Sequence, residues 1–100
     1  MISLNKPLFK LGNLVATPGA LAALESAGVS AWSLVSRHVA GDWGDLSEDD
    51  RQLNNEALTD GSRILSAYVL KTSVRVWIVT EAENDHGNRA ATTLLLPDEY

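Results

Sequence analysis

Cysteine is absent from this chain, and so are several other features that mark large classes of protein. Without cysteine there is no disulfide framework, no zinc ribbon and no cysteine nucleophile. No apolar run approaches the roughly 18 residues that suggest a membrane-spanning helix. The first ten residues contain no apolar leader segment, so we expect no signal peptide and a cytoplasmic location. There is also no glycine-rich phosphate loop and no G-x-S-x-G nucleophile elbow, which excludes several large enzyme classes.

Basic residues are few, and the negative charge is concentrated in one part of the chain. The chain has 8 Lys and Arg against 13 Asp and Glu, which gives a net charge of −5. Seven of the acids lie between residues 42 and 60, where Arg51 is the single base. A surface of this sign repels phosphate backbones and does not favour direct nucleic-acid binding. It is typical either of a solvated helix face that aids solubility or of a surface that binds a basic protein partner.

Length and residue pattern predict one α+β domain over residues 1–100. Three helices are expected, beginning after Thr17, Ser30 and Ser47, each of which can cap a helix N-terminus. Gly28 and Gly61 are expected to end the first and the third helix. The apolar faces of the three helices are predicted to consist of Leu21 and Leu24; of Trp32, Val35 and Val39; and of Leu53, Ala57 and Leu58.

After residue 63 the apolar residues alternate, which is the period of a β-strand. Strands are predicted over residues 64–70, 74–79 and 90–96, joined as an antiparallel meander. The middle run is apolar on both faces, so it should be the central strand, with helices on one side and partial cover on the other. Residues 8–16 could hold a further short strand or an extended arm.

The segment R-H-V-A-G-D-W-G-D-L (residues 37–46) is the most informative part of the sequence. Three interpretations of His38 stay open: a structural hydrogen bond to an aspartate, general acid–base catalysis, or a metal site with Asp42 and Asp45. Trp43 stands between two glycines that allow a sharp bend. It could plug the core or anchor a protein partner, whereas Trp77 in the second predicted strand is expected in the core.

Five segments resemble a family of small bacterial proteins that are labelled plasmid-related, or labelled as subunit M of a type I restriction endonuclease. These segments are L-V-A-T-P-G-A-L (14–21), R-H-V-A-G-D-W-G-D-L (37–46), R-I-L-S-A-Y (63–68), W-I-V-T-E-A (77–82) and T-T-L-L-L-P-D-E-Y (92–100). The resemblance covers nearly the whole chain. It implies a mobile-element or defence context and carries no particular activity.

A second resemblance concerns architecture alone. Helices followed by a meander sheet are similar to the barnase- and RelE-like ribonucleases, in which a histidine, a strand-borne base and a late hydroxyl cooperate. In this sequence, the residues that correspond to these three roles would be His38, Arg75 and either Thr92 or Thr93. The resemblance implies a metal-independent nuclease, in which the histidine moves a proton and the arginine stabilises phosphate charge. The acidity of the chain counts against it.

From these observations we expect a non-enzymatic, acidic interaction protein that needs no cofactor and does not associate with membranes. Its partner would be a protein with a basic surface. It would bind this partner through the acidic third helix and the Gly41–Leu46 corner, and the predicted partner-binding residues are Asp42, Trp43, Asp45, Asp49 and Glu56. In one version the acidic surface mimics a nucleic acid, and the nuclease that uses His38 is the alternative.

Overall fold

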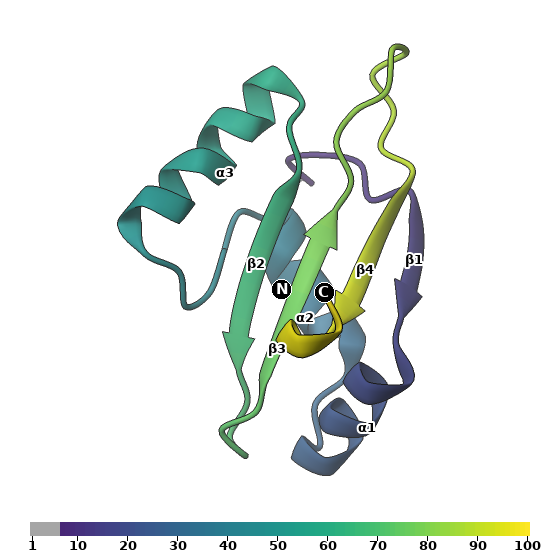
Figure 1. Cartoon of the computed structure of the whole chain (residues 1–100), viewed down its shortest axis with the longest axis vertical. Helices are drawn as coiled ribbons and strands as arrows, with labels where there is room; N and C mark the ends of the chain where they lie inside the picture. Colours follow the sequence, from purple (N-terminus) through teal and green to yellow (C-terminus); the bar gives the residue numbers. More distant parts are fainter. Residues whose placement is uncertain (1–6) are drawn as a thin grey trace, which may run out of the picture.

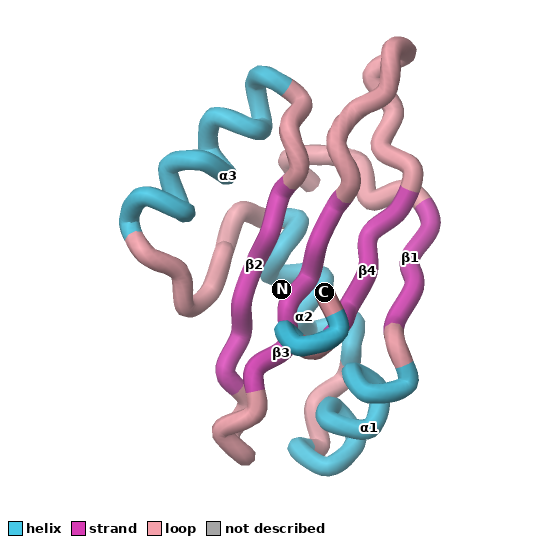
Figure 2. Tube along the Cα trace, in the orientation of Figure 1, coloured by secondary structure: helices cyan, strands magenta, loops and turns pink. Residues whose placement is uncertain are grey.

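A computed structural model describes residues 7–100 of the chain, which form three α-helices, a four-stranded sheet and a C-terminal 3₁₀ turn (Figures 1 and 2). The expectation about a leader segment falls in part on residues 1–6, outside the described residues. In chain order the elements are β1 (Asn13–Ala16), α1 (Pro18–Ala27), α2 (Ala31–Val39), α3 (Glu48–Asp60), β2 (Ile64–Val69), β3 (Arg75–Thr80), β4 (Ala91–Leu95) and η1 (Pro97–Glu99).

The fold is α+β, as the sequence predicts, but its sheet is mixed and has four strands. The strand order is β1-β4-β3-β2. The pairs β2–β3 and β3–β4 are antiparallel and form the predicted meander, with β3 inside the sheet. The further short strand that residues 8–16 could hold is present as β1, which pairs parallel to β4, with Leu14 opposite Thr92. A contact between residues so far apart in the chain leaves no trace in local periodicity.

The predicted helix boundaries are confirmed by side-chain caps. The Thr17 hydroxyl accepts a hydrogen bond from the backbone N–H of Ala20, and Ser30 and Ser47 cap α2 and α3 in the same way. Gly28 and Gly61 end α1 and α3 in the left-handed conformation, where a glycine is least costly. Each of these signals is local, which explains why the sequence reveals them.

One face of the sheet is covered by α1 and α2 (Figure 1). The main core lies between them and is formed by buried residues from both layers: Ala20, Leu24, Ala27, Leu34, Val35, Tyr68, Leu70, Val76, Ile78 and Leu94. Trp32 and Leu21, which were predicted to face the core, are instead 65% and 52% exposed. The buried side of α2 is set by Leu34, Val35 and His38, and Trp32 projects away from that side at 100° per residue.

The other face of the sheet is only partly covered. α3 lies beside the edge strand β2, and η1 crosses in front of β3 and β4 (Figure 1). The ring of Tyr100, directly after η1, stands edge-on to Trp77 on this face, with the ring centroids 5.7 Å apart. Trp77 is therefore half-buried, in contrast to the fully buried residue expected. None of the helices within residues 7–100 has the length and apolar character needed to cross a bilayer.

Candidate functional site

The segment between α2 and α3 is a docked corner that completes the edge of the sheet. The backbone N–H of Asp45 donates to the carbonyl of Ala67 (2.7 Å), and the N–H of Ala67 donates to the carbonyl of Trp43 (3.1 Å). Gly44 makes this contact possible, because it has φ +78° and a Cβ added there would lie 2.0 Å from the Ala67 carbonyl oxygen. The Tyr68 hydroxyl also donates to the carbonyl of Asp42 (2.7 Å). The conspicuous residues of this segment therefore build the corner.

Trp43 lies inside the molecule and is not available as an anchor for a partner. It is 5% exposed and packs with Ala57 and Ile64 in a second apolar cluster. Its indole N–H donates to the Oδ1 of Asn55 on α3 at 3.2 Å. The prediction that Trp43 contacts a partner does not fit its burial, because the glycine-flanked bend turns the ring inward.

His38 is fully buried, and its partners are hydroxyl groups instead of the expected aspartate. Its Nδ1 lies 2.6 Å from the Oγ of Ser66, and its Nε2 lies 2.8 Å from the Oγ1 of Thr80. Phe9 and Trp43 stand edge-on to the imidazole, with ring centroids 5.1 and 6.1 Å away. The expectation of a histidine–aspartate contact is wrong, because His38 faces the sheet while Asp42 lies at the surface beyond the helix end.

The hydroxyl groups around His38 form a chain whose direction can be assigned. The Thr92 hydroxyl donates to the carbonyl of Leu11 (2.7 Å), so its oxygen accepts from Thr80 (2.8 Å). Thr80 has then used its one hydrogen, and Nε2 of His38 must carry the hydrogen between them. Nδ1 accepts from the Ser66 hydroxyl. This chain links α2, three strands and the segment before β1 through fully satisfied buried groups.

Burial lowers the pKa of His38 to about 3, and the positive charge of Arg89 acts in the same direction. A histidine with this pKa is neutral at physiological pH, and its side chain is out of contact with solvent. Neither property suits a general acid or base, which needs a pKa near the working pH and access to substrate. The position of His38 therefore supports a structural role.

The other residues of the nuclease interpretation do not gather around His38. Thr92 is buried in the same hydroxyl chain, while Thr93 points to the opposite face of the sheet. Arg75 is on that opposite face too, where its guanidinium donates to Asp45 at 2.6 Å. The metal set of His38, Asp42 and Asp45 is also not assembled: within residues 7–100 no three histidine, aspartate or glutamate side chains converge on one point.

Two of the acidic residues of the corner are neutralised by arginines. Asp42 accepts from Nε of Arg37 at 2.7 Å, and this hydrogen bond holds the pKa of Asp42 below its usual value. Asp45 is paired with Arg75, as described above. Asp42 and Asp45 therefore contribute less to a free negative surface than the sequence suggests.

The carboxylates of α3 are different, because they are exposed and none of them forms an ion pair within the described part of the chain. They are Glu48, Asp49, Asp50, Glu56 and Asp60. Asp49 and Glu56 are seven residues apart and so lie on one side of the helix. Leu53 lies between them on that side and is 62% exposed, although it was expected to face the core. α3 therefore presents an apolar side chain flanked by two free carboxylates.

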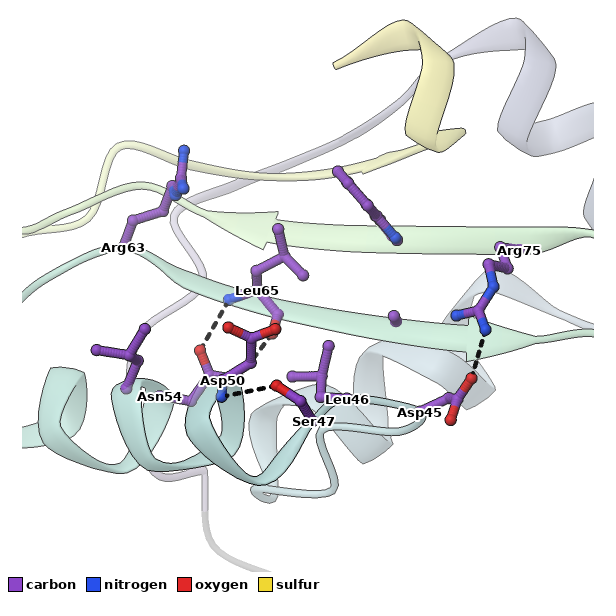
Figure 3. Close-up of a pocket in the computed structure, with 11 residues that line it drawn as sticks. Asp45, Leu46, Ser47, Asp50, Asn54, Arg63, Leu65 and Arg75 are labelled. Carbon is purple, nitrogen blue, oxygen red and sulfur yellow. Dashed lines mark hydrogen bonds and ion pairs between the residues drawn. The ribbon is translucent and has the colours of Figure 1, made fainter.

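A groove runs beside this helix, between α3 and the open face of the sheet (Figure 3). Its volume is about 330 Å³. Leu53, Asn54 and Asp50 line it from α3, and Leu65, Trp77 and Arg75 line it from the strands. Arg63 lies at one end of the groove, over the ring of Tyr100. The groove combines apolar walls with charges of both signs, which is a common composition for a binding surface.

Sequence reasoning located Asp49 and Glu56 on α3 and Asp45 in the wall of the groove, but it did not predict the groove itself. The groove depends on how far α3 lies from the sheet, and no short motif encodes that distance. The one available signal was Leu53, an apolar residue on a helix that is otherwise mostly polar.

Comparisons of the chain with protein-family profiles, with curated proteins and with solved structures give no match. The resemblance to small plasmid-related proteins therefore stays a prediction, and so does the context of mobile elements or defence that it implies.

Proposed function

We propose that this protein is a non-enzymatic binding protein whose partner is a protein with a basic surface segment. The partner would dock on the exposed side of α3 and extend into the adjacent groove. The observation that carries the proposal is the arrangement of Asp49, Leu53 and Glu56: two unpaired carboxylates on either side of an exposed leucine. A segment with basic side chains around an apolar residue is complementary to it.

The groove beside α3 also combines apolar surface with a carboxylate. Trp77 and Leu65 offer apolar surface, and Asp50 adds a further carboxylate on the α3 side. Aromatic and apolar pockets of this kind hold the anchor residues of protein partners, while charges at the rim steer the encounter. The docking region in this proposal consists of α3 and the groove, and Trp43 has no part in it.

One form of the proposal is nucleic-acid mimicry. Exposed carboxylates on α3 would then occupy a basic protein groove that otherwise holds phosphates. The support is the sign and the exposure of these groups, together with the repulsion that an acidic surface exerts on nucleic acid itself. The burial of His38 and its pKa of about 3 disagree with the proton-transfer role that the nuclease alternative requires.

Charge reversal on α3 tests the proposal. The variant Asp49→Lys with Glu56→Lys changes the charge of the proposed surface without touching buried groups. The matched control is Glu25→Lys with Asp85→Lys, which makes the same charge change at exposed positions on α1 and in the loop before β4. Each protein is immobilised and used to capture proteins from the native host at low and at high salt.

We expect a partner that wild type and control retain at low salt, that high salt releases, and that the α3 variant does not retain. Thermal unfolding of all three proteins checks that each is folded. Equal retention of the same partners by the α3 variant and by wild type would contradict the proposal. Recovery of cleaved nucleic acid in place of a protein would also contradict it.

A further inference from the structure

The two edges of the sheet are treated differently by the fold. At the β2 edge, the side chain of Asn54 occupies the outward backbone groups of Leu65. Its Nδ2 donates to the Leu65 carbonyl (2.7 Å), and its Oδ1 accepts from the Leu65 N–H (3.1 Å). The backbone groups of the corner residues Trp43 and Asp45 occupy the outward N–H and C=O of Ala67 in the same way. Strand edges are commonly blocked in natural proteins, because open edges recruit further strands.

Within residues 7–100 the β1 edge carries no such block. β1 pairs only with β4 in the sheet (Figure 1). The backbone N–H groups of Asn13 and Thr17 donate inward, to Ala90 and Leu94. Because the pattern alternates along a strand, the N–H and C=O groups of Leu14 and Ala16 point outward.

The side chains of β1 favour pairing with another strand. Leu14 and Val15 are 44% and 48% exposed, and the strand Asn13–Ala16 contains no charged residue and no proline. Charges, proline and bulges are the usual devices that protect an edge. β1 has none of these devices.

We propose that β1 pairs with β1 of a second copy of this chain, antiparallel and centred on Val15. In this register Leu14 lies opposite Ala16 of the other copy, and the outward groups of both residues form four hydrogen bonds across the two-fold axis. Val15 meets Val15 of the other copy as a non-hydrogen-bonded pair, with Cα atoms about 4.5 Å apart. The two sheets become one sheet of eight strands.

The positions of the charged residues favour a second copy of this chain as the partner of the β1 edge. The chain has a net charge of −5, which opposes self-association. The largest group of carboxylates without an ion pair among the described residues, however, is that of α3, which lies beside β2 at the opposite edge of the sheet (Figure 1). Pairing through β1 places the two acidic helices at the two far ends of the joint sheet, where screening by salt makes their repulsion weak. It also leaves both α3 surfaces exposed, although the pairing does not depend on what α3 binds.

Single cysteine variants test the register directly, because the natural chain has no cysteine. Val15→Cys brings two sulfur atoms together across the axis, within the Cα separation of about 4.4–6.8 Å that a disulfide allows. The matched control is Val69→Cys at the β2 edge, where the valine has nearly the same exposure of 49%. We expect mild oxidation to crosslink the Val15 variant at least tenfold faster than the Val69 variant. Equal rates would overturn the proposal.

A second measurement follows the mass of the protein in solution over a concentration series. Wild type and Val69→Lys should form a dimer, whereas Val15→Lys should raise the dissociation constant of the dimer at least tenfold, because it places two ammonium groups against each other. If Val15→Lys fails to fold, hydrogen exchange of the wild type at high and low concentration provides an independent test. The amides of Leu14 and Ala16 should be protected from exchange only in the dimer. A wild-type monomer at all concentrations up to about 1 mM, or unprotected amides in a dimer, would overturn the proposal.

Discussion

At the scale of single residues, His38 shows how a polar group can stabilise a small core. Each ring nitrogen has one hydroxyl partner, and the chain from Ser66 to Leu11 leaves no buried hydrogen-bonding atom of a described side chain unsatisfied. Such a network holds its elements in one arrangement, since removing any member leaves another buried group without a partner. The special residues around His38 are explained by this structural task.

The buried imidazole predicts how stability depends on pH. The pKa of His38 is about 3 in the folded protein, whereas an unfolded histidine has a pKa of about 6.5. Between these values the unfolded chain binds a proton that the folded chain does not. The free energy of unfolding therefore falls as the pH is lowered from about 6.5, with a limiting slope of about 1.4 kcal/mol per pH unit. Urea unfolding between pH 7 and pH 5 measures this slope.

The second histidine provides the control. His38→Gln should remove most of the slope in this pH range, and His86→Gln, in the exposed loop, should retain it. The lowered pKa values of Asp42, Asp60 and Glu99 act with the same sign only in more acidic solution, where carboxyl groups titrate. A wild-type His38 imidazole that titrates near pH 6.5 by nuclear magnetic resonance would show that this description of the site is wrong.

At the scale of elements, the corner and α3 together seal the β2 edge. The corner depends on Gly44, where backbone approaches backbone. Gly87 has nearly the same φ, +75° against +78°, but a Cβ added there meets nothing within 4 Å. The two glycines therefore separate the effect of a close contact from the effect of a left-handed backbone.

Gly87→Ala should cost about 1–2 kcal/mol of the free energy of unfolding, the usual penalty for a side chain in this conformation. Gly44→Ala carries that penalty and in addition forces the corner away from Ala67, so we expect at least about 2 kcal/mol more. Urea unfolding of both variants measures the difference. Similar losses in the two variants would mean that the corner does not depend on the close approach.

Asn54 is the second part of the seal. Asn54→Ala leaves the N–H and C=O of Leu65 without their side-chain partner, and this should cost about 2 kcal/mol or more. Gln52→Ala, two residues earlier on the exposed side of α3, should change stability by less than about 0.5 kcal/mol. Light scattering should also detect assemblies of the Asn54 variant that are larger than those of the wild type, because the opened β2 edge can pair with a further strand. An unchanged stability of Asn54→Ala would rule out this role.

At the same scale, the sequence predicts what is local and misses what is not. Helix caps such as Thr17 and Ser47, and the alternation in β2 and β3, lie within a few residues and are confirmed. The parallel pairing of β1 with β4, the outward turn of Trp32 and the partners of His38 depend on which elements meet in space. Local sequence patterns do not specify which elements pack against each other.

At the scale of the whole molecule, the structure divides the acidic residues between positions 42 and 60 into two groups. Those of the corner are paired with arginines and serve the fold, whereas those of α3 are free and flank an exposed leucine and a groove. The sequence could predict that the region is acidic, but pairing decides which carboxylates are available to a partner. The same separation leaves the β1 edge distant from the negative surface (Figure 1).

The proposed use of α3 is tested most directly by the dissociation constant of the captured partner, measured by calorimetry at low and at high salt. We expect Asp49→Lys with Glu56→Lys to weaken binding at low salt at least tenfold, and the control Glu25→Lys with Asp85→Lys to stay within about twofold of wild type. Added salt should also weaken the wild-type complex. A complex that ignores both the α3 substitutions and the salt would contradict it.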